Sequence, residues 1–182
     1  MNTSMTFPGF TSPAAGPDAP LDMLSACHTR VERQCQTLER LQIHLTKHSS
    51  DLEAQEAAAA IMRYFDTAAR HHHEDEEQDL FPALLEAMAG SDPVCIRQLT
   101  TQLIAEHRQL EGVWLKMRLQ LQSITKGESV LLDPTCVETF TEGYRLHIHR
   151  EEHELLPMAA RLLTPQSLKS LGEAMLERRK AS

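Results

Sequence analysis

The chain has 182 residues and carries 18 Lys and Arg against 26 Asp and Glu, which gives a net charge of −8. This length suits one domain with a core of its own. The acidity disfavours nucleic-acid binding, which needs a clustered basic surface. No apolar run approaches the roughly 18–20 residues that span a bilayer. The first residues have neither the basic start nor the apolar run of a secretory signal, so the expected compartment is the cytoplasm.

The four cysteines form no CxxC motif, and we expect them to be reduced thiols in the core. They are Cys27, Cys35, Cys95 and Cys136.

Residues 1–20 contain four of the nine prolines, and we expect a disordered or extended arm there. Beyond the arm, leucine dominates the apolar residues while valine and isoleucine are sparse, which favours helices over strands. Chain-breaking residues then separate long amphipathic segments. The predicted helices span 21–48, 51–89, 93–125 and 134–163, followed by a short one at 165–179.

Four long amphipathic helices with short connections predict an all-α fold, an antiparallel up-down four-helix bundle. The bundle is expected over residues 21–163, with a C-terminal tail helix within 164–182. An extended coiled coil is disfavoured because the breaks interrupt any continuous heptad pattern.

One histidine interrupts the apolar stripe of each long helix. The four are His28, His72, His107 and His147. A single histidine in such a stripe is typically a hydrogen-bonded core residue, but one in every helix indicates a common site. Residues of an antiparallel pair lie level when they are equidistant from the turn between them. The midpoints between successive histidines all fall in predicted turns, so we expect the four imidazoles in one layer.

A glutamate follows each of these histidines by four residues, one turn along the same helix face. These glutamates are Glu32, Glu76, Glu111 and Glu151. Buried carboxylates among imidazoles need compensating cations, and nitrogen and oxygen donors in a bundle suit iron, manganese or zinc. Two ions fit better than one, and Glu76 and Glu151 are the natural bridges between ions roughly 3.5–4 Å apart.

The remaining polar residues near the histidines have alternative interpretations. Glu111 lies one step off its apolar stripe, so a ligand and a solvated residue are equally compatible with its position. Glu32 is expected at the surface or behind the ligands. His73 flanks a predicted ligand and is expected to be either a bystander or an outer residue at the ligand entry. The charge run Glu74, Asp75, Glu77 and Asp79 is expected to be solvated.

Two prolines follow the second and fourth histidines along the chain. Pro82 and Pro157 each come one and a half turns after an H-x3-E unit. A proline inside a helix frees a carbonyl and kinks the helix. These prolines either end the site half of their helices or are kinks tolerated near helix ends.

Four sequence pieces carry a family resemblance: CHTRVERQ, HHHEDEEQDLFPAL, EHRQLE and HIHREEHELLP. At these residues the chain resembles the hemerythrin-like family, the HHE cation-binding bundles, over about residues 21–163. The resemblance implies a non-haem diiron site inside a four-helix bundle, with oxo or hydroxo and carboxylate bridges. It also implies binding of dioxygen or a related small ligand such as nitric oxide. Zinc or manganese are the alternative metals.

The predicted metal ligands are His28, His72, Glu76, His107, Glu111, His147 and Glu151. All of them except Glu111 match ligand positions of the resembled family. Its oxygen carriers have a second histidine one turn along the third helix and an aspartate after the last histidine. This chain has Glu111 and Glu151 there, and more carboxylate favours the ferric state. Sensing, redox chemistry or iron handling are therefore expected rather than oxygen carriage.

The first functional hypothesis is a binding module for a small diatomic ligand, dioxygen or nitric oxide. The alternative is an enzyme or iron donor that acts on peroxide or nitric oxide, or in repair of iron–sulfur centres. A third hypothesis is a metal-stabilised bundle without chemistry. We expect a monomer or weak oligomer with no nucleic-acid or membrane partner. The sequence does not identify a protein partner.

Overall fold

The computed structural model describes residues 18–88 and 94–181. Most of the predicted N-terminal arm, residues 1–17, and the predicted turn at 90–93 lie outside the described residues. Every regular element in the described ranges is helical. The elements are α1 (Pro20–Leu45), α2 (Leu52–Asp66), α3 (Ala68–Asp75), η1 (Glu76–Leu80), α4 (Phe81–Ala87), α5 (Val94–Thr125), α6 (Pro134–Arg150), η2 (Glu151–Leu155), α7 (Leu156–Leu162) and α8 (Pro165–Lys180).

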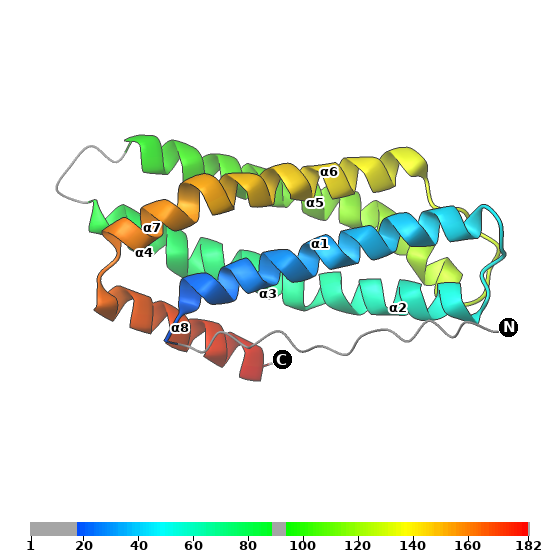
Figure 1. Cartoon of the computed structure of the whole chain (residues 1–182), viewed down its shortest axis with the longest axis horizontal. Helices are drawn as coiled ribbons and strands as arrows, with labels where there is room; N and C mark the ends of the chain where they lie inside the picture. Colours follow the sequence, from blue (N-terminus) through cyan, green and yellow to red (C-terminus); the bar gives the residue numbers. More distant parts are fainter. Residues whose placement is uncertain (1–17, 89–93, 182) are drawn as a thin grey trace, which may run out of the picture.

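The elements before α8 form four rods, because α2 continues through α3 and η1 into α4, and α6 continues through η2 into α7. The helix α1 packs against α2 and α6, and α5 packs against the same two helices. Successive rods run in opposite directions along the long axis (Figure 1). The predicted all-α antiparallel bundle is confirmed.

Local sequence signals fix the ends of these helices. The Asp51 carboxylate accepts a hydrogen bond from the backbone of Ala54 at the start of α2, and Thr164 caps α8 in the same way. Gly127 has a φ of 75°, the left-handed conformation that glycine adopts without strain, at the turn after α5.

The second and fourth rods are less regular than the sequence predicts. The second rod breaks at Thr67, whose φ of −126° and ψ of −79° are not helical. Both rods also contain a five-residue π-helical segment, in which the amide of Phe81 or Leu156 bonds to the carbonyl five residues before it. Each segment ends two residues before Pro82 or Pro157, which has no amide to donate. The widened turns begin at Glu76 and Glu151, so the prolines follow a π segment at the site.

The interior has two apolar clusters separated by a polar layer. One cluster, around Leu38, Ile61 and Phe140, fills the end of the bundle near the α1–α2 turn. The other, around Leu24 and Leu103, fills the opposite end and includes residues of α8. α8 packs along α1, α3 and η1 (Figure 1). The predicted histidine positions lie between the two clusters.

Candidate metal centre

Four imidazoles form the centre of the polar layer, and none is more than 2% exposed. They are His28 of α1, His72 of α3, His107 of α5 and His147 of α6. The Nε2 atoms of His28 and His72 are 3.1 Å apart, and those of His107 and His147 are also 3.1 Å apart. The prediction that the four imidazoles share one layer is confirmed.

Two fully buried glutamates lie between the imidazole pairs. Glu151 has one carboxylate oxygen 3.0 Å from Nε2 of His147 and the other 3.1 Å from Nε2 of His28. Glu76 has one oxygen 3.5 Å from Nε2 of His72 and the other 3.3 Å from Nε2 of His107. Each carboxylate therefore contacts one imidazole of each pair, which is the arrangement of a bridging ligand.

The donor set fits metal ions better than a network of hydrogen bonds. In the part of the chain that the structure describes, all four carboxylate oxygens of Glu76 and Glu151 are buried without a hydrogen-bond partner, which is costly unless a cation compensates. The ligand atoms form two overlapping groups in which all atoms lie within 4.8 Å of one another. The groups are His28, His72, Glu76, Glu151 and His107, His147, Glu76, Glu151. Nitrogen and oxygen donors that share two carboxylates suit a pair of first-row transition ions.

Without metal, protons must balance these buried groups. Burial alone would lower the pKa of His28 and His107, but the adjacent carboxylates outweigh it and raise each pKa to about 10. The pKa of His147 rises to about 9 because the charge of Glu151 outweighs burial in the same way. Burial and the negative charge of Glu151 raise the pKa of Glu76 to about 7. Metal ions would therefore replace protons at this centre.

Six of the seven predicted ligands are brought together, and Glu111 is not. The Glu111 side chain is 48% exposed, and it accepts a hydrogen bond of 2.7 Å from Arg108 on the outer face of α5. The cause is its position one residue beyond Leu110, whose side chain faces the core. The Glu111 carboxylate therefore lies outside the buried groups of His and Glu ligand atoms. Glu32 is exposed on α1, at the surface where it was expected.

Three further glutamates contact the outer Nδ1 atoms of the imidazoles. Glu152 lies 2.5 Å from His28, Glu77 lies 2.7 Å from His107 and Glu106 lies 3.0 Å from His147. The prediction that Glu77 is simply solvated is wrong, and the H-x3-E spacing does not indicate Glu106 or Glu152. The sequence signal that could have identified these three glutamates is that each is the direct neighbour of a predicted ligand. Glu106 precedes His107, and the other two each follow a bridging glutamate.

Asp75 also departs from the prediction of a solvated charge run. It is fully buried, and its carboxylate accepts hydrogen bonds from Arg178 and Arg179 of α8. Its partners lie about a hundred residues away in the chain, so local spacing could not have indicated them.

His73 is a fifth buried imidazole next to the layer. Its ring stacks on that of His107 with centroids 3.9 Å apart, and no described residue forms a hydrogen bond with its Nε2. It forms a third possible metal-holding group with His107 and His147. The two groups that share both glutamates account for the four-histidine layer without it.

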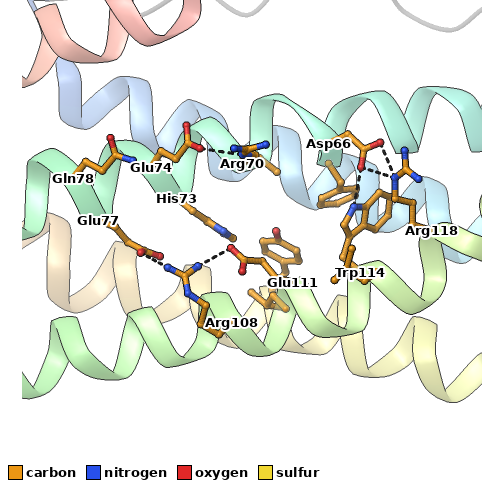
Figure 2. Close-up of a pocket in the computed structure, with 15 residues that line it drawn as sticks. Asp66, Arg70, His73, Glu74, Glu77, Gln78, Arg108, Glu111, Trp114 and Arg118 are labelled. Atoms are coloured by element: carbon orange, nitrogen blue, oxygen red, sulfur yellow. Dashed lines mark hydrogen bonds and ion pairs between the residues drawn. The ribbon is translucent and has the colours of Figure 1, made fainter. Parts of the chain in front are cut away.

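A cavity of about 710 Å³ opens between the α2–α3 rod and α5 beside the centre. His73 and Tyr144 line it together with apolar residues that include Phe65 and Trp114. In Figure 2, Arg108 joins Glu77 to Glu111 on one side of this cavity, and His73 points into the space between the helices. The cavity is thus one imidazole ring away from the candidate ligand His107.

None of the described helices combines the length and hydropathy needed to cross a bilayer.

Two comparisons relate this chain to known proteins. The chain is 34% identical over 160 residues to an uncharacterized protein of Haemophilus influenzae (strain ATCC 51907 / DSM 11121 / KW20 / Rd), covering 88% of this chain and 90% of that protein. A family model described as the hemerythrin HHE cation binding domain matches residues 19–159. Together with the buried His and Glu clusters, this match indicates a metal-binding protein. The chain belongs to the hemerythrin family of HHE cation binding domains.

Proposed function

We propose that this protein holds two iron ions and binds dioxygen or a related small ligand such as nitric oxide, in sensing, redox chemistry or iron handling. The observation that carries the proposal is the contact of Glu76 and Glu151 with one imidazole of each pair. The proposed ligands are His28, His72, Glu76, His107, His147 and Glu151. The four cysteines are free thiols, which fits the reducing cytoplasm as the proposed compartment.

The ligand residues suit iron by their chemistry. Imidazole and carboxylate donors bind iron, zinc and manganese, and family membership favours iron among them. Iron would supply one-electron redox chemistry and an electrophilic position for a small ligand. The two buried carboxylates offset part of the positive charge of two ions, which lowers the cost of burying those ions among apolar helices.

The cavity beside the centre supports a small ligand as the partner. His73 and Tyr144 form part of its lining, and the ring of His73 contacts His107. Arg108, on the cavity wall, is held by Glu77 and Glu111. Because the ring of His73 stacks on His107 beside this cavity, a small diatomic ligand suits the site better than a large substrate, which would have to displace His73 to reach His107.

The first test is metal content per chain in protein purified without added metal, combined with optical spectra before reduction, after reduction and after return to air. We expect two iron ions per chain and a visible absorption band that changes with redox state and with added nitric oxide. Zinc, or a single ion without a visible band, would contradict the proposal and favour a structural metal.

Matched variants test the ligand set. We expect His72→Ala and His147→Ala each to lower the metal content, because each removes an Nε2 donor from the layer. His153→Ala is the control, since His153 is exposed on η2 and contacts the backbone carbonyl and the ring of His149. Unchanged metal content in both ligand variants would refute the site.

The unequal surroundings of the imidazoles favour iron donation as a second candidate function. Nδ1 of His72 has no hydrogen-bond partner among the residues that the structure describes. A metal ion that is held loosely for this reason is the one that can be transferred to an acceptor such as an iron–sulfur centre. Turnover of peroxide or nitric oxide at the same centre would instead indicate an enzyme. Transfer of iron from the loaded protein to a metal-free acceptor, compared with release into buffer, separates these possibilities.

A further inference from the structure

The four layer imidazoles direct Nε2 inward, but their outer nitrogens are not equally partnered. Nδ1 of His28, His107 and His147 each lies within 3.0 Å of a glutamate carboxylate. Nδ1 of His72 is buried and has no hydrogen-bond partner within residues 18–88 and 94–181. The asymmetry divides the two groups of candidate ligands, because both imidazoles of the His107–His147 group are anchored and only one of the His28–His72 group is.

The anchoring carboxylates are themselves held in place. Glu77 is paired with Arg108, and Glu106 is paired with Arg150. Glu152, the anchor of His28, accepts a hydrogen bond of 2.6 Å from the hydroxyl of Ser25. The His107–His147 group therefore has two charged chains, each running from imidazole to carboxylate to arginine. The other group has one chain, and that chain ends in a neutral hydroxyl.

The contact pattern explains why the anchor of His72 is absent. The residue after each bridging glutamate anchors a histidine, since Glu77 contacts His107 and Glu152 contacts His28. Glu106, which directly precedes His107, anchors His147. By the same pattern, the residue before His28 would anchor His72. That residue is Cys27, whose sulfur instead accepts a hydrogen bond of 3.0 Å from Arg30.

We infer that the two metal positions are inequivalent and that the divalent ion held by His28 and His72 is released first. This inference rests on the proposed function, because it requires two bound ions. A carboxylate behind a ligating imidazole fixes its orientation and tautomer and raises its basicity, and loss of such a partner typically costs about 10–100-fold in metal affinity. The His28–His72 position lacks one such partner and holds its ion less tightly.

The experiment loads the full chain with ferrous ion under argon, measures the stoichiometry and then follows release to a chromogenic ferrous chelator in excess. We expect two ions per chain and two kinetic phases of one ion each, with rate constants that differ by about 10–100-fold. Two ions released in a single phase would overturn the inference and leave the proposed function standing. Loading of one ion or none would overturn both.

Two variants assign the phases to the positions. Glu152→Gln weakens the anchor of His28, so we expect it to accelerate the fast phase and leave the slow phase unchanged. Glu106→Gln weakens the anchor of His147, so it should accelerate the slow phase and bring the two rates together. Glu154→Gln is the control, because Glu154 is an exposed glutamate of the same π segment as Glu152. The reverse assignment of the phases would overturn the inference, and the helical circular dichroism of each variant shows that it is folded.

Discussion

His73 is buried against His107 and lines the cavity beside the centre, and its Nε2 has no hydrogen-bond partner among the described residues. His73 is therefore either part of the cavity wall or a metal ligand in the group that it forms with His107 and His147. The bridging contacts of Glu76 and Glu151 involve only the other four imidazoles. That difference favours a role for His73 in the cavity wall over a role as a metal ligand.

We therefore predict that His73→Phe retains two ions per chain. Phenylalanine keeps an aromatic ring in contact with His107 but has no ligand atom. The measurement is metal content by elemental analysis beside His72→Phe, which removes a proposed ligand one residue earlier. Loss of an ion from His73→Phe would place this imidazole among the ligands.

At the residue scale, the sequence predicts side chains that repeat along a helix face and fails where an interaction joins distant segments. The apolar stripes identify His28, His72, His107 and His147 because each replaces a core residue in its own helix. The apolar stripe of α5 leaves the role of Glu111 ambiguous. Each residue turns a helix by about 100°, so a position one residue off the stripe can face either the core or solvent. Glu77 and Asp75 look alike in the charge run of the sequence. Packing against α5 brings Glu77 into contact with His107, and packing against α8 makes Asp75 a buried ion paired with arginines.

At the scale of elements, the two π segments place the bridging glutamates in equivalent positions. Each segment starts at a bridging glutamate and ends before a Phe-Pro or Leu-Pro pair. The sequence identifies the prolines but not how the chain accommodates them. A kink, a helix end and a π turn can each accommodate a residue that has no backbone N–H to donate. The break at Thr67 has no glycine or proline to indicate it, so periodicity predicts one continuous helix there.

The helix α8 is fastened to the rod that carries His72 and Glu76. Arg178 and Arg179 both donate to the buried carboxylate of Asp75, which directly precedes Glu76 in the chain, and Arg178 also donates to Asp79 at 2.7 Å. Burial raises the pKa of the Asp75 carboxyl above its ordinary value even though the two arginines oppose the shift. Asp75 therefore depends on α8 to remain buried as an ion.

We predict that Arg178→Ala combined with Arg179→Ala lowers the free energy of unfolding by about 3 kcal/mol, near the low end of the cost of stripping a buried ion of its partners. Adding Asp75→Asn should restore part of this loss, because the buried charge is then gone. Urea unfolding measures both effects. Lys180→Ala, which removes an exposed pair with Glu177, is the control and should change stability by less than about 0.5 kcal/mol. A double variant as stable as this control would show that the ion pairs of Asp75 with Arg178 and Arg179 contribute nothing to stability.

At the scale of the whole molecule, the polar layer connects metal binding to the stability of the bundle. It separates two apolar clusters that would otherwise form one core. Without metal, its buried carboxylates are compensated by protonated imidazoles, which is why the pKa values of His28, His107 and His147 are raised to about 9–10. With metal, the same imidazoles must be neutral to bind. Protons and metal ions therefore compete for one layer.

This competition predicts opposite pH dependences for the two forms between pH 6.5 and 8.5. A histidine whose folded pKa is raised above its ordinary 6.5 stabilises the fold fully below pH 6.5 and loses that contribution as the pH rises toward the folded value. Glu76, with its pKa raised to about 7, acts in the same direction. The melting temperature of the metal-free protein in a chelator should therefore fall as the pH rises through this range. With excess ferrous ion under argon it should rise, because fewer protons compete for the ligands and binding stabilises the folded state by mass action. A metal-free protein whose melting temperature rises with pH would show that these imidazoles are neutral in the empty layer, and that something other than protons compensates its carboxylates.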